Sequence, residues 1–195
     1  MSAIVHDRYD DAYLRKILRD TKTIAMVGAS ANWNRPSYFA MKYLLDRGYK
    51  VIPVNPAAAG QEILGQKVYG SLTELPAKAD MVDIFRNSEA AGPITDDAIK
   101  HGAKIVWMQL GVRNDAAAKR AEEAGLKVVM NRCPKIEYGR LSSEISWMGV
   151  NSRTLSSKRP PAPTQGMRLS LNRMSVGGGD TAASDRAAKN KTEQS

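Results

Sequence analysis

Thiols and soft metal ligands are scarce in this sequence, which has one cysteine, Cys133, and two histidines, His6 and His101, among 195 residues. A single cysteine excludes a disulfide within the chain and is typical of proteins that work in a reducing cytoplasm. So few soft ligands also leave little material for a zinc or copper site. We therefore expect a cytoplasmic protein without a metal centre.

Long hydrophobic runs are missing as well. The apolar stretches are short, well below the roughly 20 residues that a membrane-spanning helix needs. Residues 1–11 mix acidic and basic side chains and contain no apolar core, so they lack the pattern of a secretory signal. We expect no contact with a membrane.

Aromatic residues make up only 6% of the chain, and Trp33, Trp107 and Trp147 lie far apart in the sequence, so no platform for stacked bases is indicated. The net charge is +9, of which residues 151–195 carry +5 and residues 1–150 carry +4. The basic segment could bind RNA weakly and in a salt-dependent way, but solvated disorder is the simpler interpretation. We do not expect a nucleic-acid partner.

What the sequence does contain is a repeated pattern of Gly, any residue, Lys and then an apolar run, which begins at Gly48, Gly102 and Gly125. Each copy follows a helix-like stretch, and a glycine at positive φ is a common way to end a helix. The apolar runs are typical of strands that are buried on both faces, as in parallel sheets. The pattern therefore predicts helices followed by buried strands.

Two further apolar runs, residues 23–27 and 79–85, bring the number of predicted strands to five. Strands that alternate with helices indicate right-handed crossovers. The predicted fold is therefore α/β, a Rossmann-like doubly wound parallel sheet over residues 21–150. An amphipathic helix within residues 1–20 precedes it, and residues 60–76 form a turn-rich excursion. Because Pro and Gly cluster in residues 151–195, we expect a basic, mostly disordered tail there.

The first strand runs directly into a turn of small residues, Gly28-Ala29-Ser30, and a helix is predicted from Ser37. Phosphate binding needs backbone N–H groups that are exposed in such a turn and lie near a helix N-terminus. Ser30 adds a hydroxyl group, and Arg35 can supply a charge-assisted hydrogen bond. The alternative is a tight turn that binds nothing, but the first such turn of a doubly wound sheet is a common ligand site.

The details of this turn argue against both NAD and ATP hydrolysis. The dinucleotide pattern G-x-G-x-x-G keeps its first glycine, Gly28, and loses the other two. The second strand ends at Asn55-Pro56, where an NAD enzyme places an acidic residue for the ribose hydroxyls. The Gly-Lys-Ser/Thr of a Walker loop is absent from the sequence.

The motifs that follow one another along the chain resemble the CoA-binding domain family, Rossmann-like proteins related to the CoA-binding domain of the succinyl-CoA synthetase alpha subunit. The resemblance covers residues 24–141. It is carried by Val27-Gly-Ala-Ser30, Arg35-Pro-Ser37, Val51-Ile-Pro-Val-Asn-Pro56, Val82-Asp-Ile-Phe-Arg86, Val106-Trp-Met-Gln-Leu-Gly111 and Asn131-Arg-Cys-Pro134.

The resemblance implies that the ligand is coenzyme A or an acyl-CoA, bound where the strands end. Its diphosphate would lie on the turn Gly28-Ala29-Ser30, with Arg35 and Ser37 nearby. Asn55 and Pro56 would border the adenosine part.

The same resemblance implies that Phe85 and Arg86 flank the nucleotide, with Arg86 placed to meet a phosphate. Gln109 would lie near the thiol-bearing arm or would only hold its own loop. Residues after Leu141 lie outside the resemblance, which therefore implies nothing about them.

Catalytic candidates are few. His101 lies at a helix end, where a cation is favourable, and His6 lies in a flexible N-terminal segment, so we expect a structural role for the first and none for the second. Cys133 could form a mixed disulfide with CoA or act as a nucleophile, but a small, partly buried residue before Pro134 is the simpler interpretation. Asp83, on a central strand, is expected to bind a backbone amide.

We therefore expect a carrier, sensor or partner subunit that binds CoA and has no complete catalytic site of its own. The alternative is a subunit of a thioester-handling enzyme, such as an acyl-CoA ligase or transferase, whose partner protein brings the catalytic residues.

Overall fold

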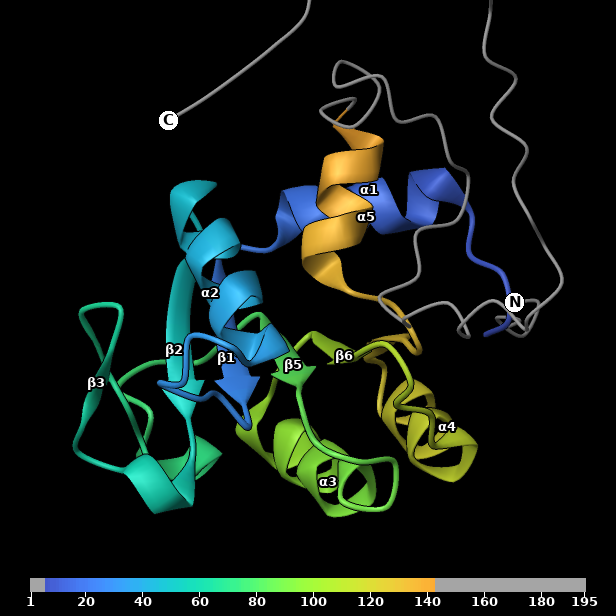
Figure 1. Cartoon of the computed structure of the whole chain (residues 1–195). Coiled ribbons are helices and arrows are strands. Elements are labelled where there is room, and N and C mark those ends of the chain that lie inside the picture. The colour runs from blue at the N-terminus through green and yellow to red at the C-terminus, as the bar shows by residue number, and fades with distance from the viewer. Residues whose placement is uncertain (1–5, 143–195) are drawn as a thin grey trace, which may run out of the picture. The chain divides into compact units, whose positions relative to one another are not determined.

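The computed structural model describes residues 6–142 (Figure 1). Their centre is a parallel sheet of five strands in the order β2-β1-β5-β6-β7. The strands are β1 (Thr23–Val27), β2 (Lys50–Val54), β5 (Met81–Ile84), β6 (Ile105–Met108) and β7 (Lys127–Val129). The predicted fold class is confirmed. The predicted boundary at residue 150 and the tail over residues 151–195 lie outside the described residues and stay predictions.

Helices cover both faces of this sheet (Figure 1). They are α1 (Asp11–Asp20), α2 (Pro36–Asp46), α3 (Ala91–His101), α4 (Asp115–Glu123) and α5 (Pro134–Leu141). One core cluster joins α1, α2 and α5 to alternate strand residues such as Met26, Met81 and Trp107. The other joins α3 and α4 to the residues between them, such as Val27 and Val82. Successive strand side chains point to opposite faces, which is why both faces need an apolar cover.

The repeated Gly-x-Lys pattern has the structural meaning that was predicted. Gly48, Gly102 and Gly125 follow the C-terminal ends of α2, α3 and α4, and their φ angles are +84°, +77° and +86°. In α3 the N–H of Gly102 closes the helix on the carbonyl of Ile99, at 3.0 Å. After each of these glycines the chain enters a strand within a few residues. The glycine therefore sets the spacing between helix and strand.

The N-terminal helix also forms as expected. The carboxylate of Asp10 accepts a hydrogen bond from the N–H of Ala12 at 2.8 Å and so caps α1. Leu14, Ile17 and Leu18 on one side of the helix are buried in the first core cluster. Within residues 6–142, no helix has both the length and the apolar character required to cross a membrane.

The structure adds detail that the sequence did not predict. The excursion over residues 60–76 contains a small antiparallel hairpin, β3 (Glu62–Ile63) with β4 (Gln66–Lys67), between two short 3-10 helices, η1 (Pro56–Ala58) and η2 (Leu72–Glu74). Helix α5 was not predicted at all.

Candidate functional site

The order of the strands singles out one position on the sheet edge. From β1 the chain crosses through α2 to β2 on one side, and it later returns to β5 on the other side of β1. The loops that follow β1 and β5 therefore leave the sheet in opposite directions. In open α/β sheets, ligands bind at this reversal, beyond the carboxyl ends of the strands. The turn at Gly28 and the segment Phe85-Arg86 begin there.

Gly28 lets these two segments approach each other closely. Its φ angle is +88°, and its N–H donates to the carbonyl of Val54 at 2.8 Å. A β-carbon at this position would lie 2.7 Å from the carbonyl oxygen of Phe85 and 3.0 Å from Cδ of Arg86. The N–H of Phe85 in turn donates to the carbonyl of Val27 at 2.8 Å. Two predicted site segments, 57 residues apart in the sequence, are thus in contact, and the Arg86 side chain lies against the turn.

The rest of the turn leads to the N-terminus of α2. Ala29 is buried, and the Ser30 hydroxyl accepts the N–H of Asn32 at 3.2 Å, so it helps to fold the turn. Arg35 is exposed and precedes the first helical residue, and no side chain caps this end of α2. Ser37, the second residue of α2, is 4% exposed. A helix N-terminus without a side-chain cap carries partial positive charge and favours an anion.

Asn55 and Pro56 lie next to this turn, after β2. The Asn55 amide donates to the carbonyl of Ala29 at 2.8 Å, and its oxygen accepts the N–H of Ala57 at 3.0 Å. Asn55 therefore ties the turn after β1 to η1, which begins at Pro56. This bracing role was not foreseen in the sequence, where the side chain was expected to border a ligand.

Gln109 follows β6 and forms a buried pair with Asp83 of β5. Its Nε2 donates to both carboxylate oxygens of Asp83, at 2.9 and 3.1 Å, and its backbone N–H donates to the carbonyl of Ile84 at 3.3 Å. Asp83 is fully buried, and its burial raises its pKa to about 8, although the hydrogen bond from Gln109 lowers it. The prediction that Asp83 binds a backbone amide is wrong: its partner is the Gln109 side chain.

Cys133 is buried immediately before α5. Burial raises its pKa to about 11, an effect that the N–H of Ile136 reduces and the nearby Asp83 increases. The thiolate, which is the reactive form, is therefore scarce at neutral pH. The geometry favours the structural interpretation of Cys133 over that of a nucleophile.

His6 departs from the expectation that it has no role, whereas the structural role expected of His101 is confirmed. His6 is engaged: its Nδ1 lies 2.9 Å from the Tyr9 hydroxyl, and its Nε2 lies 3.3 Å from a Glu122 carboxylate oxygen. His101 has a structural role, but not as a cation. Its Nε2 accepts the N–H of Ala79 at 3.0 Å, which requires the neutral ring.

Acid should therefore weaken the fold at His101. Burial and the charge of Lys78 lower the pKa of His101 below its usual value near 6.5. Between that value and the lower folded pKa, the unfolded chain binds a proton that the folded chain does not, so the free energy of unfolding falls as the pH falls through this window. Urea denaturation of the natural protein and of His101→Asn from pH 7.5 to 5 isolates this contribution, because the natural protein should lose free energy of unfolding relative to the variant as the pH falls. An identical slope in the two proteins would contradict this role.

The sequence model of the CoA binding domain matches residues 22–139 of this chain. The chain is 35% identical over 127 residues to the uncharacterized protein YneT of Bacillus subtilis (strain 168), which covers 65% of this chain and 93% of YneT. A hypothetical protein from Pyrococcus horikoshii OT3 has a similar structure, with a TM-score of 0.67 and 42% identity, over 73% of this chain and 99% of that one.

A larger enzyme subunit is also similar. The chain is 34% identical over 93 residues to the alpha subunit of acetate–CoA ligase [ADP-forming] I of Pyrococcus furiosus, over 46% of this chain and 20% of that subunit. The chain belongs to the CoA binding domain family and is related to domains of ligase alpha subunits. The resemblance predicted from the sequence motifs is confirmed.

Proposed function

We propose that this chain binds coenzyme A or an acyl-CoA at the carboxyl edge of β1 and β5. The close contact of Gly28 with Phe85 and Arg86 carries the proposal, because it places an arginine side chain against a turn whose backbone can receive a phosphate. The family match supports CoA as the anion. The raised pKa of Asp83 also supports it, since burial favours the neutral carboxyl, which adds no negative charge to the edge.

In this proposal the CoA diphosphate lies on the turn at residues 28–30, near the α2 N-terminus with Arg35 and Ser37. Arg86 binds a phosphate, and Phe85 packs on the nucleotide. Asn55 holds the turn in place while Pro56 borders the adenosine part.

The thiol-bearing arm would extend toward Gln109. That amide already donates to Asp83, so Gln109 shapes the end of this path more than it binds the ligand. The chain acts as a carrier, sensor or partner subunit.

Calorimetry with CoA, acetyl-CoA, NAD and ATP tests the proposal directly, with CoA expected to bind most tightly. Arg86→Gln should weaken CoA binding by about tenfold, because a charge-assisted hydrogen bond contributes roughly 1.5–3 kcal/mol. Arg120→Gln is the matched control: Arg120 is an exposed arginine on α4 that pairs with Asp96 and should leave CoA affinity unchanged. NAD binding more tightly than CoA, or equal CoA affinity in the two variants, would refute the proposed site.

A second candidate function is that of a subunit in a thioester-handling enzyme, in which another protein supplies the catalytic residues. It is favoured by the similarity to a ligase alpha subunit of which this chain spans only one fifth. Affinity purification of the full chain from its native cell should then recover a partner, and the pair should act on an acyl-CoA. A chain that is recovered alone and leaves acyl-CoAs unchanged argues against this role.

A further inference from the structure

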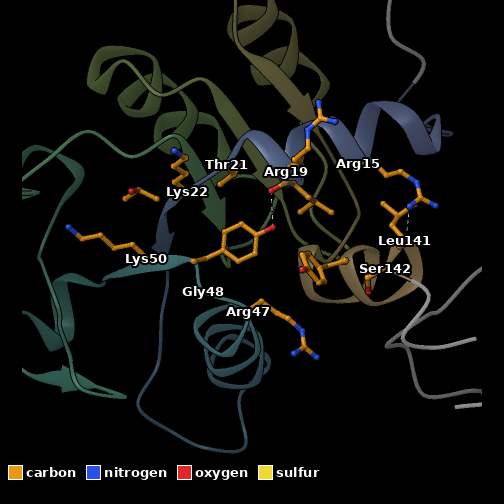
Figure 2. A pocket seen from close by; sticks show the side chains of 13 residues that line it. Arg15, Arg19, Thr21, Lys22, Arg47, Gly48, Lys50, Leu141 and Ser142 are labelled. Atoms are coloured by element: carbon orange, nitrogen blue, oxygen red, sulfur yellow. Dashed lines mark hydrogen bonds between the residues drawn. The ribbon is translucent and has the colours of Figure 1, made fainter. Parts of the chain in front are cut away.

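A second candidate site lies at the opposite edge of the sheet, where β1 and β2 begin. A cavity of about 700 Å³ opens there, beside the C-terminal ends of α1, α2 and α5 (Figure 2). Its cationic lining residues are Arg15, Arg19, Lys22, Arg47 and Lys50 (Figure 2), and Tyr49 also lines it. We call this cavity the basic pocket.

The basic pocket is separate from the proposed CoA site. The strands are parallel, so Lys22 and Lys50 stand at their starting ends and Gly28 at the far end. Five residues of extended strand span about 16 Å, which is the length of β1 between the two edges. A ligand in the basic pocket is therefore a second ligand, and the inference goes beyond the proposed function.

Charge is the first feature that points to a ligand. Five of the thirteen residues that line the basic pocket are cationic, and none of the thirteen is acidic. Lys22 directly precedes β1, Lys50 is the first residue of β2, and the N–H of Lys50 donates to the Lys22 carbonyl at 2.9 Å. Neither lysine side chain forms an ion pair with any residue from 6 to 142, whereas Lys16, Lys42 and Lys104 are each paired with an aspartate.

Helix ends explain part of this positive charge but not all of it. The C-terminus of each helix carries partial negative charge, which attracts cations. Arg15 donates to the carbonyl of Leu141 at the end of α5, and Arg19 lies 3.3 Å from the Asp20 carboxylate at the end of α1. Lys22 and Lys50 belong to no helix, so this account does not cover them.

Two aromatic rings form the second feature. Tyr49 is 9% exposed, and its hydroxyl donates to the carbonyl of Leu18 at 2.8 Å, which fixes the ring. The Tyr138 ring stands edge-on to it, with centroids 6.0 Å apart. The two tyrosines therefore add a fixed apolar part to the lining of the basic pocket. A cavity of several hundred Å³ is of the size that holds small-molecule ligands.

We propose that the basic pocket binds an organic diphosphate of nucleotide size, with its phosphates near Lys22 and Lys50 and its apolar part on Tyr49 and Tyr138. ADP is a suitable probe, because it combines a diphosphate with an aromatic ring. Amide NMR spectra of the full chain should show saturable shifts at Thr23, Gly48, Tyr49 and Lys50 during an ADP titration. Pyrophosphate should give weaker shifts at the same amides, because it lacks the ring.

The variant Lys22→Gln/Lys50→Gln should weaken ADP binding at these amides by about a hundredfold, because it removes two charge-assisted contacts of about tenfold each. The control variant Lys100→Gln/Lys119→Gln removes the same charge from α3 and α4 and should bind ADP as the natural protein does. Equal ADP affinity in the two variants, or no saturable shift at millimolar ADP, would overturn the proposal.

The positions of the shifted amides also distinguish the two proposed sites. ADP shifts confined to residues 28–30 would overturn the second site and leave the proposed CoA site in place. CoA shifts confined to the basic pocket would overturn the proposed CoA site and support this one.

Discussion

Replacing Gly28 with alanine should lower the free energy of unfolding by ~3 kcal/mol and abolish most CoA binding. The left-handed φ of +88° costs an L-residue roughly 1–2 kcal/mol. The new β-carbon would also stand 2.7 Å from the Phe85 carbonyl oxygen, and backbone cannot swing aside as a side chain can, so overpacking adds about 1–3 kcal/mol. To relieve the clash, the segments after β1 and β5 must separate, which moves Arg86 away from the turn. Urea denaturation and calorimetry with CoA measure the two effects.

Gly125→Ala is the control for backbone strain. Gly125 has nearly the same φ, +86°, but an added β-carbon there meets nothing within 4 Å. Its replacement should therefore cost only the strain, about 1 kcal/mol, and should leave CoA affinity intact. If the two alanine variants lose the same free energy of unfolding, the close approach of the two segments does not contribute to stability. If Gly28→Ala binds CoA as the natural protein does, the close approach does not contribute to CoA binding.

The sheet was predictable because its signals are local. Each Gly-x-Lys segment combines a helix stop with a buried strand, and both signals lie within a few residues. Helix α5 carries no such signal. Its buried residues are Pro134, Glu137, Gly139 and Leu141, a mixture without an apolar stripe, and Gly139 is a poor helix former. Pro134 suits the first position of a helix, but it does not by itself predict one. Tertiary packing beside α1 and α2 holds it in the fold.

The candidate site was predictable in part. Residues at the carboxyl ends of parallel strands share one edge, so Gly28, Asn55 and Arg86 could be grouped before their contacts were known. Which of them touch depends on β5 lying next to β1, and strand order is a long-range property. The basic pocket was missed for the same reason, because its cations come from α1, from the end of α2 and from the starts of two strands.

The pair formed by Asp83 and Gln109 gives the second large effect. Asp83→Asn should make the protein more stable than its natural form above pH 8, by ~2 kcal/mol or more, and should remove a loss of stability that develops between pH 4 and 8. The folded pKa of about 8 lies above the unfolded value near 3.9. Between these values the unfolded chain has released a proton that the folded chain keeps, so the free energy of unfolding falls as the pH rises. Each unit of pKa difference corresponds to about 1.4 kcal/mol.

Asp80→Asn provides a comparison, because the pKa of Asp80, three residues before Asp83, is shifted in the opposite direction. Burial raises the pKa of Asp80, but hydrogen bonds from Lys104 and from the N–H groups of Thr23 and Lys22 outweigh it and lower the pKa overall. Asp80 therefore stabilises the fold at neutral pH and loses that effect in acid, so Asp80→Asn should weaken the protein at pH 7 and leave the decline toward pH 8 in place. Urea denaturation of both variants at pH 5, 7 and 9 separates the two behaviours. If Asp83→Asn follows the natural protein at all three values, Asp83 is ionised in the fold, and its charge then stands close to the proposed path of the CoA arm.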